Sequence, residues 1–181
     1  MSILKISLGE KKDKKLLVPK NIEPVKNIVK LAIFSILGEF IKNSVCLDLF
    51  AGSGNLGFTA LSLGAKDCTF VENSPEAVDC IRKNALDLGF ENKSHIMQER
   101  IESFLSSPHK IKYNILFMDP PYKLTIDNNA KKLLNCISGK GVIVYLHHKN
   151  TEVKIDGFSV VKQRFYGKTG LSLLKKAKDA I

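Results

Sequence analysis

Residues 45–57, which read VCLDLFAGSGNLG, constrain the fold of this chain more than any other stretch. Apolar residues surround a single acid, Asp48, and such a run is typical of a strand buried on both faces of a parallel sheet. Gly52 and Gly54 then permit a tight turn and the close approach of a ligand to the backbone. From Asn55 onward the apolar residues return at helical spacing. A strand, a glycine turn and a helix N-terminus in this order predict a nucleotide-type pocket.

The same alternation continues along the chain. Further strands are expected at 67–71, 94–97, 113–118 and 141–146, with a closing pair at 153–165 and 171–174. Helices are expected at 24–41, 75–88, 101–105 and 124–137, and Lys26, Lys30 and Lys42 should point outward from the first of them. This pattern predicts an α/β fold, a doubly wound, Rossmann-like sheet of seven mostly parallel strands.

The first 20 residues differ from the rest. Apolar positions within residues 2–8 and 16–18 flank a polar turn, which indicates a small β-hairpin. We expect residues 1–20 to form a basic appendage and residues 21–181 to form the main domain. The turn carries Lys11, Lys12, Lys14 and Lys15, which we expect to contact nucleic acid. A solvated tail is the alternative interpretation.

Composition narrows the functional class. A net charge of +10 and a pI of about 9.4 favour binding to polyanions, although a generally lysine-coated surface would give the same numbers. No apolar run approaches the roughly 20 residues of a membrane span, and the first residues do not resemble a signal peptide. The four cysteines are scattered without a C-x-x-C pair, so we expect reduced thiols, no metal site and a cytoplasmic protein.

Ligands of open parallel sheets bind beyond the carboxyl ends of the strands, and three groups of residues are expected there. They are the glycine turn, Glu72 after the second strand, and Asp119-Pro120-Pro121-Tyr122 after the fourth. Glu72 follows the glycines at a spacing suited to an acid that hydrogen-bonds a ribose diol. G-S-G-N-L-G also satisfies the dinucleotide pattern, but Asp48 would repel a pyrophosphate. An ammonium-bearing ligand such as S-adenosylmethionine is therefore favoured over a dinucleotide.

The tetrapeptide at 119–122 is the most specific signal in the chain. Two prolines after a buried strand remove two backbone donors and leave carbonyl acceptors. Asp119 adds a carboxylate acceptor, and Tyr122 adds an aromatic face on which a base can stack. Acceptors that hold the hydrogens of a base amine favour its attack on a methyl group. This combination indicates an amino-methyltransferase, while an ordinary proline turn is the alternative.

Four motifs, DLFAGSG, VEN, DPPY and RFYGKTGLSL, together resemble the bacterial 16S ribosomal RNA guanine-N2 methyltransferase family over nearly the whole chain. The resemblance implies methylation of a guanine 2-amino group within an assembling small ribosomal subunit, with S-adenosylmethionine as the methyl donor. A monomer is the default expectation, since the sequence carries no signal for oligomeric state. The resemblance implies that the cofactor contacts Asp48, Phe50, Gly52, Ser53, Gly54, Glu72, Asn73, Arg100 and Ile101. It further implies that Asp119, Pro120, Pro121 and Tyr122 hold the target guanine.

Several positions depart from the family pattern. Glu23-Pro24-Val25 stands where Arg-Pro-Thr is usual, Ile28 replaces an Arg, and only Lys30 keeps the charge in that helix. Arg100 stands where an acceptor for the adenine amine is common, so Glu99 or a backbone carbonyl would have to substitute. These differences bear on RNA docking and cofactor affinity more than on the fold.

A basic and aromatic cluster near the C-terminus, Arg164, Tyr166 and Lys168, is a candidate contact to the RNA backbone, or it solvates a hairpin. His147 and His148 are adjacent on an expected strand and point to opposite faces, so they are unsuited to sharing a metal ion. Two rival functions remain: a DNA adenine methyltransferase, for which the chain has no separate target-recognition domain, and a non-catalytic RNA-binding assembly factor. Binding of S-adenosylmethionine would distinguish the second rival from an enzyme.

Overall fold

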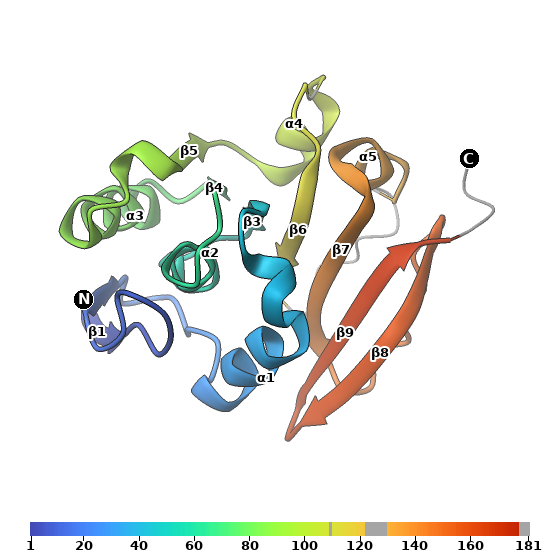
Figure 1. Ribbon diagram of the computed structural model, residues 1–181, viewed down its shortest axis with the longest axis horizontal. Helices are drawn as coiled ribbons and strands as arrows, with labels where there is room; N and C mark the ends of the chain where they lie inside the picture. The colour runs from blue at the N-terminus through green and yellow to red at the C-terminus, as the bar shows by residue number, and fades with distance from the viewer. Residues whose placement is uncertain (109, 122–129, 178–181) are drawn as a thin grey trace.

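In the computed structural model, which describes residues 1–108, 110–121 and 130–177, one large sheet runs through the molecule with helices on both faces (Figure 1). The strands are β1 (Ser2–Lys5), β2 (Lys15–Val18), β3 (Val45–Leu49), β4 (Asp67–Glu72), β5 (Ser94–Gln98), β6 (Tyr113–Met118), β7 (Ile137–His148), β8 (Phe158–Tyr166) and β9 (Thr169–Lys176). The helices are α1 (Asn27–Leu37), α2 (Asn55–Ser62), α3 (Pro75–Leu88), α4 (Ile101–Ser106) and α5 (Ala130–Cys136), with 3₁₀ turns η1 (Gly38–Ile41) and η2 (Glu91–Lys93).

The sheet has the predicted doubly wound, mostly parallel form. Its seven strands lie in the order β5-β4-β3-β6-β7-β9-β8. The first five of these pair in parallel, and β9 joins β7 and β8 in antiparallel pairs. β3 is the middle one of the five parallel strands, so Asp48 lies between Phe70 of β4 and Phe117 of β6. The strand order reverses around β3, which is where a ligand crevice is expected in such a sheet.

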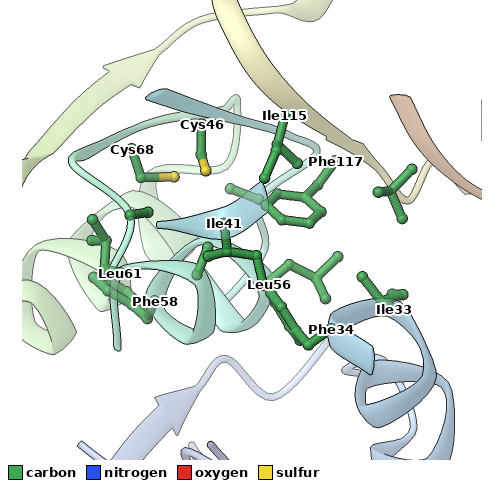
Figure 2. Close-up of a cluster of buried hydrophobic side chains, with 14 of the residues drawn as sticks. Ile33, Phe34, Ile41, Cys46, Leu56, Phe58, Leu61, Cys68, Ile115 and Phe117 are labelled. Atoms are coloured by element: carbon green, nitrogen blue, oxygen red, sulfur yellow. The ribbon is translucent and has the colours of Figure 1, made fainter. Parts of the chain in front are cut away.

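Each face of the sheet has its own apolar core. The first core joins α1, α2 and α3 to the sheet, and Figure 2 shows side chains of α1 and α2 gathered below Ile115 and Phe117 of β6. Phe58 and Phe70 pack with ring centroids 4.7 Å apart. The second core joins α4 and α5 to the opposite face and includes Leu47 and Leu116. Because alternate residues of β3 enter different cores, the strand is apolar almost throughout.

The first helix differs from the prediction. It begins at Asn27, three residues after Pro24, and continues into η1. Ile28 is 61% exposed, whereas Lys30 is only 2% exposed, so the prediction that Lys30 points outward is wrong. Lys30 and Phe34 are four residues apart and share the inward face, and the lysine is tolerated there because its Nζ donates to Asn55 Oδ1 at 3.0 Å.

The predicted N-terminal hairpin is present as the β1–β2 pair. Ile6, Leu16 and Val18 are fully buried, and its turn packs on the end of α2, where Ser62 Oγ donates to the carbonyl of Leu8 at 2.7 Å. Asn84 of α3 exchanges two hydrogen bonds with the backbone of Leu17. The hairpin is thus seated on two helices of the main sheet, and the boundary at residue 20 stays a prediction.

The remaining strands and helices lie where the sequence pattern places them, except that β8 begins at Phe158, five residues later than predicted, and β7 begins early, at Ile137. Ser74 caps α3 and Gly89 ends it in the left-handed conformation, as the motif predicts. The helix expected at 124–137 is described only as α5, since residues 122–129 lie outside the described residues. Within the described part of the chain, none of the helices has the length and apolar character that a membrane crossing requires.

Replacement of Gly57 by alanine tests how tightly α2 sits on the sheet. An added Cβ would lie 2.3 Å from a ring carbon of Phe70 and 2.7 Å from the Cys68 sulfur. We expect Gly57→Ala to lower the free energy of unfolding by about 1–3 kcal/mol through overpacking, as measured by urea denaturation. Gly139→Ala is the matched control, because nothing lies within 4 Å of its added Cβ. Equal stability of the two variants would contradict this packing.

Candidate active site

A cavity of about 780 Å³ lies beyond the carboxyl ends of the parallel strands. The glycine turn and the proline loop both line it, so the predicted meeting of these two segments is confirmed. Predicted residues that line it are Asp48, Phe50, Gly52, Ser53, Glu72, Asn73, Arg100, Ile101, Asp119, Pro120 and Pro121. Tyr122 lies outside the described residues.

The glycine turn after β3 has a backbone that few residues adopt. Gly52 and Gly54 have φ values of 57° and 76°, and Phe50 has a φ of 63°. The N–H of Gly54 donates to the carbonyl of Ala51 at 2.7 Å, which closes the turn. A left-handed conformation at a phenylalanine is strained, and such strain gathers at functional sites. Gly54 lies behind the cavity wall, where an added Cβ would come within 2.6 Å of the Phe58 ring.

Glu72 is held in place by the backbone around it. Its Oε2 accepts from the N–H of Gly52, and its Oε1 accepts from the N–H groups of Asn73 and Ser74, each at 2.9 Å. A carboxylate offers about four acceptor positions, so three backbone bonds leave room for a ligand hydroxyl. The carboxylate therefore joins the ends of β3 and β4 and still faces the cavity.

Asp48 is the buried acid of the central strand. It is 3% exposed, and its Oδ2 accepts from the N–H of Gly57 at 2.9 Å. Burial, together with the nearby charges of Asp119 and Glu72, raises the pKa of Asp48 well above its usual range, although the Gly57 bond opposes this. Asp119 and Glu72 thus both act on the buried Asp48 carboxyl at the cavity. Such a wall repels phosphates and suits a cationic ligand.

Asp119 follows β6 and feels the charge of Glu23, which lies in the irregular segment before α1. Burial is the main cause that raises the pKa of Asp119 to about 6, and the charge of Glu23 adds to it. Residues 19, 21–26 and 29 form a wall of the cavity. Glu23 departs from the family pattern, but the sequence does not predict this wall, because the segment is irregular and carries no periodic signal.

The predicted RNA-binding residues are spread over different regions. Lys168 lines the cavity from the β8–β9 turn, Arg164 is exposed on β8, and Tyr166 packs partly against the core. The hairpin lysines lie away from the cavity, with Lys11 Nζ 5.4 Å from the centre of the Phe90 ring. Lys30 is buried and cannot touch RNA in this conformation.

His147 has a structural position at the end of β7. It is buried, its Nε2 lies 2.9 Å from Ser172 Oγ, and its Nδ1 lies 2.8 Å from the carbonyl of His148. Burial lowers the pKa of His147, which keeps the ring neutral. Among the residues the structure describes, no three His, Cys, Asp or Glu side chains are grouped to hold a metal ion.

Comparisons with known proteins agree with this geometry. The family described as "Conserved hypothetical protein 95" matches residues 4–175. Ribosomal RNA small subunit methyltransferase D of Buchnera aphidicola subsp. Baizongia pistaciae is 34% identical over 139 residues, covering 75% of this chain and 70% of that protein. "Putative rRNA methyltransferase YlbH" of Bacillus subtilis is 29% identical over 96% of this chain and 99% of its own length. The structure of "Putative methyltransferase yhhF" from Escherichia coli has a TM-score of 0.88 at 25% identity, with 97% of this chain and 98% of that chain covered.

The Asp119→Asn substitution should stabilise the protein in a pH-dependent way. The pKa of Asp119 is about 6 in the folded state against a usual value of 3.8, so ionisation of this carboxyl favours unfolding. The resulting loss of stability is complete above pH 6. We expect Asp119→Asn to raise the free energy of unfolding by up to about 3 kcal/mol near pH 7.5, with the gain vanishing near pH 4. Urea denaturation at both pH values measures this, with Asp156→Asn, an exposed acid, as the control. A pH-independent gain would contradict the interpretation.

Proposed function

The chain belongs to the family described as Conserved hypothetical protein 95 and has the fold of class I S-adenosylmethionine-dependent methyltransferases, and from this premise we propose that it methylates the 2-amino group of a guanine in small-subunit ribosomal RNA. Relatives named Ribosomal RNA small subunit methyltransferase D, at 33–34% identity, support the choice of substrate. The assembling small subunit is the proposed partner.

One observation carries the proposal: the Asp119-Pro120-Pro121 loop and the glycine turn line a single cavity. A methyl group can pass from a cofactor to a base only if both are held in one enclosed space. The carboxyl groups of Asp48 and Glu72 suit a ligand that carries an ammonium and a sulfonium, and they disfavour a dinucleotide. The residues present therefore fit S-adenosylmethionine, which when bound supplies an activated methyl group.

The residues around β3 and β4 are proposed to orient the cofactor. Glu72, fixed by three backbone N–H groups, accepts hydrogen bonds from the ribose hydroxyls. Asn73, Arg100 and Ile101 border the adenine, and the glycine turn lets the backbone approach the methionine end. Arg100 has its Nε 3.5 Å from Glu102 Oε2, so its charge is directed toward a carboxylate on α4.

The loop after β6 is proposed to position the guanine. Pro120 and Pro121 offer carbonyl acceptors without competing N–H donors, and ionised Asp119 accepts from the 2-amino group. These acceptors stabilise the positive charge that develops on nitrogen as the methyl arrives. The amine then loses a proton to Asp119 or to water. Stacking of the base on Tyr122 remains a prediction.

Basic residues outside the acidic cavity are proposed to contact the RNA backbone. Lys168 lies at the rim of the cavity, and Arg164 is on the exposed face of β8. Lys12, Lys14 and Lys15 are exposed at the hairpin turn. Phosphate contacts of this kind weaken as salt concentration rises.

Removal of the Asp119 carboxylate tests the catalytic role. We expect Asp119→Ala to retain its fold and its affinity for S-adenosylmethionine by isothermal titration, and to lower turnover by roughly 100-fold or more because an acceptor for the developing charge is lost. Turnover is measured as N2-methylguanine formed in small-subunit RNA, detected by mass spectrometry. Asp156→Ala is the control. Parent-rate methylation by Asp119→Ala would disprove the role, and absence of cofactor binding in the parent protein would favour a non-catalytic assembly factor.

The pH profile of the reaction offers a separate test. Because the proposed acceptor is ionised Asp119, whose pKa is about 6, kcat/KM should fall as the pH drops through about 6. Glu23→Gln removes the second cause of the raised pKa, so the acidic limb should move to lower pH. Glu76→Gln, which changes another acid of the cavity wall, is the control and should leave the limb in place. An unshifted limb in Glu23→Gln would show that another group controls it.

A further inference from the structure

One corner of the cavity is not acidic. Asn55, the first residue of α2, lines the cavity and is 4% exposed. Behind it lies Lys30 of α1, whose Nζ donates to Asn55 Oδ1 at 3.0 Å. Both helices cover the same face of the sheet (Figure 1). A buried ammonium beside a helix N-terminus makes this corner electropositive.

The lysine fixes the orientation of the asparagine amide. An ammonium group can only donate, so the Asn55 oxygen must face Lys30 and the NH₂ group must point elsewhere. Asn55 Nδ2 is buried and has no hydrogen-bond partner among the described residues. A buried donor without an acceptor is unfavourable, and native proteins rarely leave one unfilled unless a ligand or water completes it.

We propose that Asn55 Nδ2 binds the α-carboxylate at the methionine end of S-adenosylmethionine and that Lys30 positions the amide and supplies the compensating charge. This inference rests on the proposed function. An α-amino acid group carries a carboxylate and an ammonium side by side, and the cavity offers a matching pair of environments. The Asn55 amide donor, backed by the Lys30 ammonium, suits the ligand's carboxylate. Asp48 and its neighbouring acids suit the ligand's ammonium.

The protonation state of Lys30 agrees with this role. Burial lowers the pKa of Lys30 to about 8, so the side chain is still mainly charged at neutral pH. Lys30, which was expected to contact RNA, instead lies behind the part of the cavity wall that is proposed to bind the cofactor. Lys30 does not itself line the cavity, which makes it a positioning residue.

A purely structural role is the competing explanation, in which the Lys30–Asn55 bond only ties α1 to α2. Asn55→Asp separates the two explanations. An aspartate keeps an oxygen for Lys30 and converts the bond to an ion pair, so the tie between the helices persists. It also replaces the NH₂ donor by an anionic oxygen, which would repel a ligand carboxylate.

Isothermal titration of the full chain with S-adenosylmethionine and with decarboxylated S-adenosylmethionine tests the proposal. The parent protein should bind the carboxylate-bearing compound about 10- to 100-fold more tightly. Asn55→Asp should lose this preference while its thermal unfolding midpoint is maintained, and Lys30→Met should also lose it. Lys42→Met, which changes an exposed lysine paired with Glu39, should keep the parent preference.

Two results would overturn this proposal alone, and a third would overturn it together with the proposed function. Equal binding of both compounds by the parent protein would remove the carboxylate site while leaving the methyltransferase function intact. A parent-like preference in Asn55→Asp would assign the Lys30–Asn55 bond to structure alone. Failure of the parent protein to bind either compound would instead refute the proposed function together with this inference.

Discussion

The hydrogen bond from the Gly57 N–H to Asp48 Oδ2 joins the central strand to the helix that follows it. The carboxylate is buried in the middle of the sheet, and the backbone donor partly offsets the cost of that burial. The bond requires close approach of α2, which the missing Cβ of Gly57 permits against Phe70 and Cys68. The position of α2 then fixes the glycine turn and Asn55, and these form one side of the cavity.

The acidic side chains at the cavity lower the stability of the folded protein. Asp48, Glu72 and Asp119 are close enough for Asp119 and Glu72 each to raise the pKa of Asp48. Glu72 is compensated by three backbone N–H groups and Asp48 by one, whereas burial and the charge of Glu23 raise the pKa of Asp119. Such a site is least stable without a ligand. It is suited to bind cationic and amine groups, because these groups supply hydrogen-bond donors and positive charge to the carboxyl groups.

The sequence was sufficient for features governed by local patterns. Buried strands such as 113–118, the capping residues Ser74 and Gly89, and the meeting of the glycine turn with Asp119 all follow from periodicity, turn chemistry and parallel topology. Two features could not be predicted in that way. The burial of Lys30 depends on a partner 25 residues away, and hydrophobicity alone assigns a lysine to the surface. The wall around Glu23 is irregular backbone whose place is set only by tertiary packing.

The separation of charge over the molecule connects the cavity to its proposed substrate. The chain has a net charge of +10, yet the cavity is lined by Glu23, Asp48, Glu72 and Asp119. An exposed basic surface attracts the RNA backbone from a distance, while the acids within the cavity repel phosphate. A nucleotide can therefore satisfy both regions only if its phosphates stay outside and its neutral base enters. This favours an extruded guanine whose amine hydrogens face Asp119, because hydrogen-bond donors are the groups that an acidic cavity accepts.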